Sequence, residues 1–323
     1  MKAGGRKGLL ALARASVLAL CLGAASASFA NALALRDDEP DALKSATVLV
    51  VDEQTGEVLY GKNTGVVAPI ASITKLMTAI VTLDANLPLD ERVTITEDDL
   101  DTYKGTRSRL PIGTTLTRAE MLHLALMASE NRAASSLGNS YPGGQGAFVA
   151  AMNAKAAELG MKDTRFVEPT GLSSENVSSA QDLARLVAAA NGYPLIREYS
   201  TSTGYEVEIR GRRVAFANTN GLVRSGDWDI GVSKTGFIRE AGRCLVMQAR
   251  VAARSVIIVL LDSWGTFTRI ADAARIRAWL EPGYALPAPP PTARKASGKA
   301  TVKQVAKTGK GNAKATKGSS GRV

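Results

Sequence analysis

The strongest constraint on the fold is a run of six apolar residues, Val-Ile-Ile-Val-Leu-Leu, at positions 256–261. Side chains alternate between the two faces of a strand, so an uninterrupted run predicts a strand that is buried on both faces. The patterns at 230–235 and 243–251 predict two strands before it, and those at 46–51 and 57–60 predict a hairpin near the start. We therefore expect the chain to leave an antiparallel sheet and later return to it.

The segment between these strands is mostly helical in pattern, and apolar residues repeat near the 3.6-residue period from Ile73 to Leu83. Further helices are expected at 118–127, 146–159, 179–190 and 266–280. Two more strands are expected at 205–209 and 212–217. The order of elements predicts an α+β domain, in which an antiparallel sheet carries a helical insertion and a final helix closes the domain.

The net charge of +10 belongs to the two ends of the chain. Residues 1–32 contain four basic and no acidic side chains, and residues 285–323 contain nine basic and no acidic ones, which leaves −3 for residues 33–284. A mildly acidic, apolar-rich centre is typical of a globular domain. The sequence therefore predicts one domain at 33–284 between two segments of a different kind.

Residues 1–32 have the three parts of a secretory signal: basic residues at the start, a short apolar stretch, and small residues from position 25. The apolar stretch is shorter than the roughly 20 residues that a membrane span needs. No later segment has the pattern of a transmembrane anchor. We expect a signal peptide at 1–32, cleaved between residues 27 and 33, and an exported protein.

Residues 285–323 begin with a Pro-rich spacer and continue with Lys, Ala, Gly, Thr and Ser. This composition cannot bury enough apolar surface to fold, so it predicts a disordered basic tail. Two roles are open for the tail: it aids solubility, or it makes a salt-sensitive contact with a polyanion or the cell wall. Nucleic acid is not an expected partner, because an exported protein rarely meets any.

His123 is the single histidine, which excludes His-rich zinc sites and mechanisms with two imidazoles. It lies in an apolar helical pattern, where a satisfied core or flanking side chain is the simpler interpretation. No metal-binding, phosphate-loop or Gly-x-Ser-x-Gly motif is present. Cleavage of the signal removes Cys21 and leaves Cys244, which we expect in the core. Among the hydrolytic mechanisms considered, the one that is left is attack by a serine with a lysine as its base.

One Ser-x-x-Lys motif is present, Ser72 to Lys75, at the predicted start of the helix that follows Pro69. Residues i and i+3 share a face of a helix, so the Lys75 amine can reach the Ser72 hydroxyl. Free N–H groups in the first turn of a helix favour developing negative charge. A Lys75 whose pKa is lowered by burial and by nearby cations could accept the Ser72 proton.

Two further motifs each occur twice. Of the Ser-x-Asn motifs, Ser129–Asn131 directly follows an apolar helix, which is a rigid support, whereas 174–176 follows a turn and is interpreted as a loop or helix-capping segment. Of the Lys-Thr-Gly motifs, 234–236 ends a predicted strand and 307–309 lies in the tail. On a strand edge, the first would offer a cation and a hydroxyl to a carboxylate, and its glycine would allow close approach of a substrate backbone.

The order Ser-x-x-Lys, Ser-x-Asn, Lys-Thr-Gly resembles the penicillin-recognising serine enzymes, the D,D-peptidases and serine β-lactamases. The resemblance covers residues 46–280. Five segments look most like the D-alanyl-D-alanine endopeptidases of the penicillin-binding protein 7 type: 69–78, 129–134, 169–172, 180–184 and 227–236. The resemblance implies an α/β (α+β) fold of the β-lactamase and D,D-peptidase kind, with an antiparallel five-stranded sheet, flanking N- and C-terminal helices, and an all-helical insertion.

The resemblance also implies the chemistry of the site. Ser72 attacks the D-alanyl peptide carbonyl and becomes the acyl-ester, and Lys75 is the general base. Ser129 relays a proton to the leaving amine, and Asn131 holds a substrate amide. These roles describe a serine peptidase that cleaves peptidoglycan in the periplasm, soluble or loosely associated with wall or membrane, and that is acylated by β-lactams.

Substrate recognition falls, by the same resemblance, to the Lys-Thr-Gly strand. Lys234 and Thr235 bind the carboxylate next to the scissile bond, while Gly236 allows the substrate to approach. The N–H groups of Ser72 and Phe237 form the oxyanion hole. Neither a metal nor a cofactor is expected.

Three alternatives stay open. A serine β-lactamase of the commonest class needs a Glu-x-x-Leu-Asn setting for deacylation, and none lies between Asn131 and Lys234. D,D-carboxypeptidases usually carry a second β-rich domain and an amphipathic C-terminal anchor, whereas 39 low-complexity residues follow Tyr284 here, which favours an endopeptidase. A non-catalytic wall-binding protein would be labelled by fluorescent penicillin without turnover of muropeptides.

Overall fold

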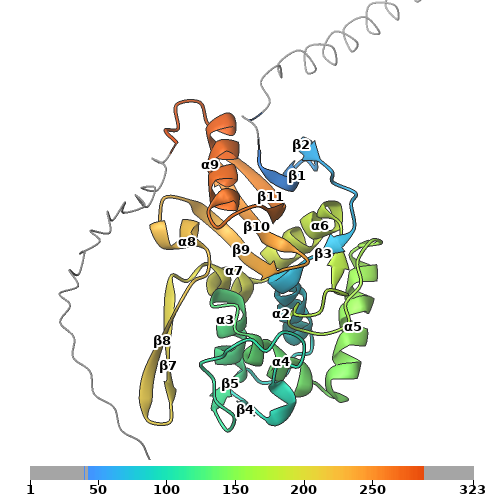
Figure 1. The fold of residues 1–323 in the computed structure, drawn as a ribbon, viewed down its shortest axis with the longest axis vertical. Coiled ribbons are helices and arrows are strands. Elements are labelled where there is room, and N and C mark those ends of the chain that lie inside the picture. The colour runs from blue at the N-terminus through green and yellow to red at the C-terminus, as the bar shows by residue number, and fades with distance from the viewer. Residues whose placement is uncertain (1–39, 41–42, 287–323) are drawn as a thin grey trace, which may run out of the picture. The chain divides into compact units, whose positions relative to one another are not determined.

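Five strands form an antiparallel sheet in the order β2-β1-β11-β10-β9 in the computed structural model, which describes residue 40 and residues 43–286 (Figure 1). The strands are β1 Ser45–Asp52, β2 Val58–Lys62, β9 Asp229–Ile238, β10 Gly242–Val251 and β11 Arg254–Ser263. β11 pairs with β1 on one side and β10 on the other, so the first and last strands are neighbours in the one antiparallel sheet that the sequence predicted. β9 lies at the edge of the sheet.

The apolar run 256–261 is the centre of this sheet, and its side chains divide between two cores. Val256, Ile258 and Leu260 belong to the cluster beneath α9 (Thr268–Leu280). The alternate residues at 257, 259 and 261 belong to the larger cluster on the opposite face. All six are at most 2% exposed, which confirms the predicted strand with two buried faces.

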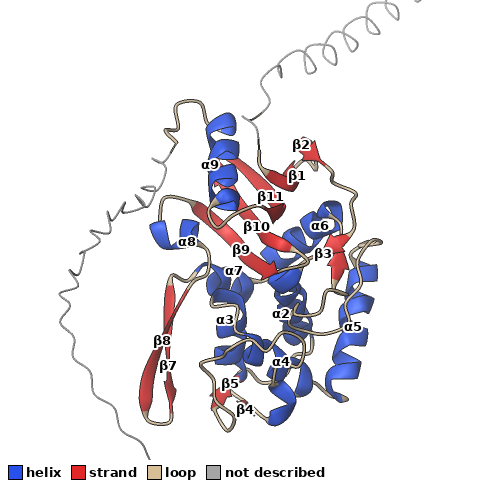
Figure 2. Ribbon diagram, viewed as in Figure 1, coloured by secondary structure: helices blue, strands red, loops and turns tan. Residues whose placement is uncertain are grey.

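Helices cover both faces of the sheet (Figure 2). α9 packs on one face, against β1, β10 and β11, and α6 (Ala180–Asn191) packs on the other, against the same three strands. The remaining α-helices are α2 Thr74–Asp84, α3 Arg118–Met127, α4 Asn131–Asn139, α5 Gly144–Glu158, α7 Pro194–Thr201 and α8 Gly221–Ser225. Two short 3₁₀-helices are η1 Ala71–Ile73 and η2 Glu97–Asp99. The predicted helices are present, whereas α4, α7 and α8 were not predicted.

The insertion between β2 and β9 is not all-helical, contrary to expectation. It contains three two-stranded ladders, β3 Ala68–Pro69 with β6 Val177–Ser178, β4 Arg92–Thr94 with β5 Thr115–Thr117, and β7 Gly204–Ile209 with β8 Arg212–Ala217. The last is the hairpin predicted at 205–217, and it projects away from the five-stranded sheet (Figure 1). Pairs of two or three residues carry too little alternation to be recognised in a sequence.

Several predictions fall on residues 1–39, 41–42 and 287–323, outside the described part of the chain. They concern the signal peptide, the flanking N-terminal helix, and the basic tail beyond residue 286. Within the described residues, no helix combines the length and the apolarity that a membrane crossing requires.

Candidate active site

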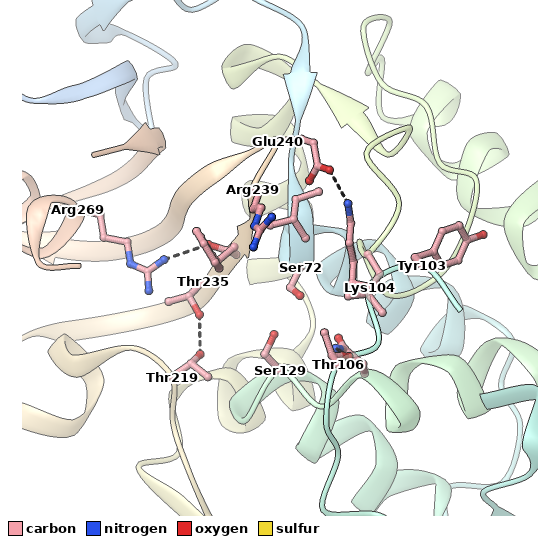
Figure 3. A pocket seen from close by; sticks show the side chains of 15 residues that line it. Ser72, Tyr103, Lys104, Thr106, Ser129, Thr219, Thr235, Arg239, Glu240 and Arg269 are labelled. Carbon is pink, nitrogen blue, oxygen red and sulfur yellow. Dashed lines mark hydrogen bonds and ion pairs between the residues drawn. The ribbon is translucent and has the colours of Figure 1, made fainter. Parts of the chain in front are cut away.

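The three motifs meet at a cavity of about 720 Å³ between β9 and the helical insertion (Figure 3). Ser72, Ser129 and Asn131 line it from the insertion, and Thr235, Gly236 and Phe237 line it from the sheet edge. Figure 3 shows the side chains of Ser72 and Ser129 directed into the same space. Motifs more than 50 residues apart in the sequence are therefore brought together by the fold.

Ser72 lies in the 3₁₀ turn η1, immediately before α2. Ala71 in this turn has a positive φ of 48°, a conformation that costs a residue with a side chain some free energy. The Thr74 hydroxyl donates to Ala71 O at 2.8 Å and fastens the turn. The result is a partly exposed serine on a tight turn, rather than inside a regular helix.

Lys75 is fully buried, and its Nζ donates three hydrogen bonds, to Ser72 Oγ at 2.9 Å, Asn131 Oδ1 at 2.8 Å and Thr170 O at 2.6 Å. Three contacts match the three N–H donors of an ammonium group. Burial lowers the pKa of Lys75 to about 8, although nearby Glu168, Glu130 and Asp101 favour the charged form. After loss of one proton, two N–H groups still serve Asn131 and Thr170, and the lone pair is free to accept the Ser72 hydroxyl.

Ser129 lies in the connection between α3 and α4, with a positive φ of 57°. The end of α3 and the start of α4 hold it in place, and Glu130 caps α4 by accepting from Arg132 N. Asn131 is the first residue of α4, and its amide also donates to Thr106 Oγ1 at 3.0 Å. This Ser-x-Asn motif therefore presents a hydroxyl and an amide to the cavity.

Lys234 is buried on β9, and its Nζ donates to Ser129 Oγ at 2.8 Å and to Thr235 O at 3.0 Å. Burial is the main cause that lowers its pKa well below the usual value, and the positive charges of Lys75 and Arg269 add to the effect. Ser129 thus lies beside a second buried amine, on the opposite wall from Lys75.

Gly236 lets β9 approach the Ser72 turn closely. A β-carbon at this position would lie 3.0 Å from Ile70 O and 3.2 Å from Ser72 N, tighter than ordinary contact. Phe237 follows with an exposed ring, over which the Arg243 guanidinium lies at 4.6 Å from the centroid. Because β9 is an edge strand, its outer backbone groups are not used by the sheet.

The cavity includes residues that the sequence did not indicate. Thr219 accepts a hydrogen bond from the Thr235 hydroxyl at 2.6 Å. Arg269, at the start of α9, donates to Gly236 O at 3.1 Å and to Cys244 O at 2.9 Å. Lys104 and Glu240 both line the cavity and form an ion pair at 2.5 Å (Figure 3). No local motif marks these residues, because each reaches the cavity through tertiary structure alone.

The residues that the sequence analysis did not assign to the active site lie in the core or in a loop. His123 is 8% exposed, stacks on Tyr199 at 4.4 Å between ring centroids, and contacts Ser202 Oγ through Nε2. Cys244 is a free, buried cysteine whose pKa is raised to about 11 by burial. Both predictions of core roles are confirmed. Residues 174–176 lie in a loop, as predicted, but Asn176 is completely buried.

Among the described residues, no group of three or more His, Cys, Asp or Glu side chains is arranged to hold a metal ion. The polar side chains that line the cavity are six hydroxyls, one amide, three cations and one carboxylate: Ser72, Tyr103, Thr106, Ser129, Thr219, Thr235, Asn131, Lys104, Arg239, Arg269 and Glu240. This arrangement can transfer an acyl group to a serine of the protein from a substrate that bears a carboxylate.

Comparisons with known proteins agree with this chemistry. A family model described as D-alanyl-D-alanine carboxypeptidase matches residues 34–265. The chain is 52% identical over 250 residues to a D-alanyl-D-alanine endopeptidase of Pseudomonas aeruginosa, covering 76% of this chain and 81% of the relative. It is 46% identical over 261 residues to that of Escherichia coli, covering 80% and 84%. The solved structure of the Streptomyces K15 DD-transpeptidase matches with a TM-score of 0.69 at 28% identity, covering 75% of this chain and 98% of that one.

Proposed function

Because the chain belongs to the D-alanyl-D-alanine carboxypeptidase family of serine peptidases, we propose that it is a D,D-endopeptidase that hydrolyses the D-alanyl cross-links of peptidoglycan. The similarity to two D-alanyl-D-alanine endopeptidases extends over more than four fifths of each relative. The catalytic domain corresponds to residues 33–284.

Ser72 is the nucleophile and Lys75 the base. The observation that carries this assignment is the 2.9 Å contact between Lys75 Nζ and Ser72 Oγ, made by an amine whose pKa burial lowers to about 8. Neutral Lys75 takes the hydroxyl proton as Oγ attacks the D-alanyl carbonyl, and the resulting oxyanion is bound by the N–H groups of Ser72 and Phe237. Ser129 then relays to the leaving amine the proton that Lys75 accepted, the C–N bond breaks, and the acyl-ester remains on Ser72 while Lys75 is neutral again.

Water attacks the ester in the second half of the reaction, which releases the D-alanyl carboxylate and returns the proton to Ser72. The substrate is oriented by Asn131, which holds an amide, and by Lys234 and Thr235, which bind the carboxylate beside the cut bond. Arg269 adds a further positive charge at this end of the cavity. Penicillins, which carry a carboxylate next to a strained amide, acylate Ser72 in the same way.

The substrate preference is tested with purified muropeptides. Cross-linked dimers and monomeric pentapeptides are incubated separately with the protein and with Ser72→Ala, and products are identified by mass. We expect monomers from the dimer and no products with the variant. Release of D-alanine from the pentapeptide without cleavage of the dimer would indicate a carboxypeptidase instead, and penicillin labelling with neither product would indicate a non-catalytic binding protein.

The ends of the chain complete the proposal. A secretory signal at 1–32 directs the protein to the periplasm, and the basic tail attracts it to the anionic wall. Deletion from Pro287 is expected to leave hydrolysis of small soluble substrates unchanged and to weaken binding to sacculi, with a difference that fades as salt rises. Equal binding of sacculi by both forms in a pull-down at low salt would rule out this role of the tail.

A further inference from the structure

A buried glutamate organises the loop next to the cavity. Glu168 is 2% exposed and lies at the start of residues 168–176, named here the Glu168 loop. Its carboxylate oxygens accept from the backbone N–H of Thr170 at 2.6 Å, Gly171 at 2.6 Å and Ser173 at 3.3 Å. They also accept from the Thr170 hydroxyl at 2.5 Å and the Asn176 amide at 3.0 Å. All five groups donate, so the side chain acts only as an acceptor, as a carboxylate does.

The Glu168 loop holds the amine of Lys75 directly. The Thr170 carbonyl accepts from Lys75 Nζ at 2.6 Å, the shortest of the three contacts of that amine. The preceding carbonyl, Pro169 O, accepts from the Thr78 hydroxyl at 2.6 Å, one turn further along α2. Two successive carbonyls of the loop are therefore fixed to the helix that carries the base.

The same loop also contacts the turn that carries Ser72. The buried Asn176 amide donates to Thr74 Oγ1 at 3.1 Å as well as to Glu168. Gly171 has a positive φ of 80°, and a β-carbon there would collide with the Ala71 carbonyl. The loop thus packs against both members of the Ser-x-x-Lys motif.

The charges that face Lys75 come from several elements. Burial lowers the pKa of Lys75, and Glu168 is the strongest of the three acids that oppose this effect, ahead of Glu130 on the connection before α4 and Asp101 on the loop after η2. On the other wall, β9 presents a cation, Lys234. Tyr103, whose pKa is raised mainly by burial and further by Glu168, lines the cavity without a charge of its own at neutral pH.

We propose that Glu168 is a positioning residue for the serine acylation: it shapes the Glu168 loop so that Thr170 O holds the Lys75 amine beside the Ser72 hydroxyl. Its negative charge also keeps the resting ammonium from losing its proton too readily. This inference rests on the proposed function, because it requires Lys75 to be the base. Glu168 is not among the residues that line the cavity of Ser72, and its oxygens are occupied by the loop.

The test compares the pH dependence of acylation by a chromogenic penicillin in five forms of the full chain: wild type, Glu168→Gln, Glu168→Asp, Glu175→Gln and Ser72→Ala. Glu175 lies on the same loop, but its side chain is 67% exposed, so its variant is the matched control. Thermal unfolding establishes that each variant is folded.

For Glu168→Gln, we expect the midpoint of the rise in rate with pH to move down by about one unit, because an opposing charge is gone, and the plateau rate to fall on the order of 10-fold because the loop is displaced. Glu168→Asp should keep the midpoint and lose rate, and Glu175→Gln should match wild type. An unmoved midpoint in Glu168→Gln, or an equal shift in Glu175→Gln, would overturn the proposal.

Two further outcomes keep the proposals separate. If Glu168→Gln does not fold, Glu168→Asp decides, because it keeps the charge and shortens the side chain, and a wild-type rate in this variant would overturn the positioning role. Acylation of Ser72→Ala at the wild-type rate would instead remove the proposed function itself, whatever Glu168 does.

Discussion

Two buried lysines lie on opposite walls of the cavity, in contrasting surroundings. Lys75, on the helical side, has three acceptors and three acids nearby, and the pKa of its amine is lowered to about 8. Lys234, on the edge strand, has two acceptors, and the charges that affect it are the cations Lys75 and Arg269. The two amines are therefore equally buried but differ in the charges and in the number of hydrogen-bond acceptors around them.

The difference shows how one residue type can serve two purposes. The site of Lys75 is complete without substrate, since every N–H of its ammonium has a partner and the acids offset part of the cost of burial. The site of Lys234 lacks an anion among the described residues that contact it. We expect a substrate carboxylate to supply that anion. The charged form of Lys234 is then more stable in the complex with substrate than in the free protein.

The largest effect is expected where Lys75 acts. Ser72→Ala removes the nucleophile and should reduce acylation by penicillin on the order of 10⁴-fold or more, while thermal unfolding changes little because the serine is partly exposed. Labelling with fluorescent penicillin measures the loss. Ser174→Ala, in the other Ser-x-Asn motif, is the matched control and should label normally. Persistent labelling of the Ser72 variant at another serine would refute the assignment.

The opposite wall is tested by Lys234→Ala. Loss of a buried cation that pairs with a carboxylate should reduce kcat/KM on the order of 10²- to 10³-fold. The comparison becomes sharper with a substrate whose carboxylate is converted to an amide. Wild type should lose activity on the amide, and the variant should discriminate little between the two substrates. A variant that still prefers the carboxylate as strongly as wild type would show that another cation binds it.

The pH dependence separates the two amines in the wild-type protein. A base is active when neutral, so the acylation rate should rise about 10-fold per pH unit below 8 and level off as pH passes the pKa of Lys75, about 8. Lys234 is needed in its charged form, and a bound carboxylate favours that form although burial lowers the pKa of the free amine, so the rate should fall again above the pKa that Lys234 has in the complex. Stopped-flow acylation between pH 6 and 10 measures both limbs. A rate that does not change between pH 6 and 8 would contradict a lysine base.

The smallest effect is expected at the hydroxyl pair on the sheet side. Thr219→Val removes the acceptor of the Thr235 hydroxyl, which should then orient less well toward the carboxylate and raise KM about 3- to 10-fold. Thr115→Val is the matched control, because it breaks another Thr–Thr hydrogen bond, with Thr94, in an exposed ladder. Equal KM values for Thr219→Val and Thr115→Val would show that Thr219 does not contribute to substrate binding.

The part of the site that sequence reasoning could predict is the part set by local geometry. The contact between Ser72 and Lys75 follows from the i,i+3 spacing near a helix start. The contact of Ser129 with Lys234 joins residues 105 positions apart and was not predicted; the family resemblance only assigned both residues to one site. Thr219, Arg269 and the carbonyl of Thr170 carry no signal of their own.

The fold shows the same division. The strand at 256–261 was evident because six buried residues in a row have few other solutions. α4 was missed because it has one large apolar residue, Leu137, and buries mainly small side chains that leave a weak pattern. α7 was missed for a related reason, since Ile196 is its one large buried apolar residue.

The pairing of β1 with β11 has a consequence for how this molecule is made. Ser45 pairs with Ser263, so the central hydrogen bonds of the sheet join residues more than 200 positions apart. A growing chain cannot close the sheet until its last strand is available, and contacts of such long range slow the search for the native state. Fragments that stop before residue 254 leave one hydrogen-bonding edge of β1 without its partner, and are thus expected to aggregate or be degraded.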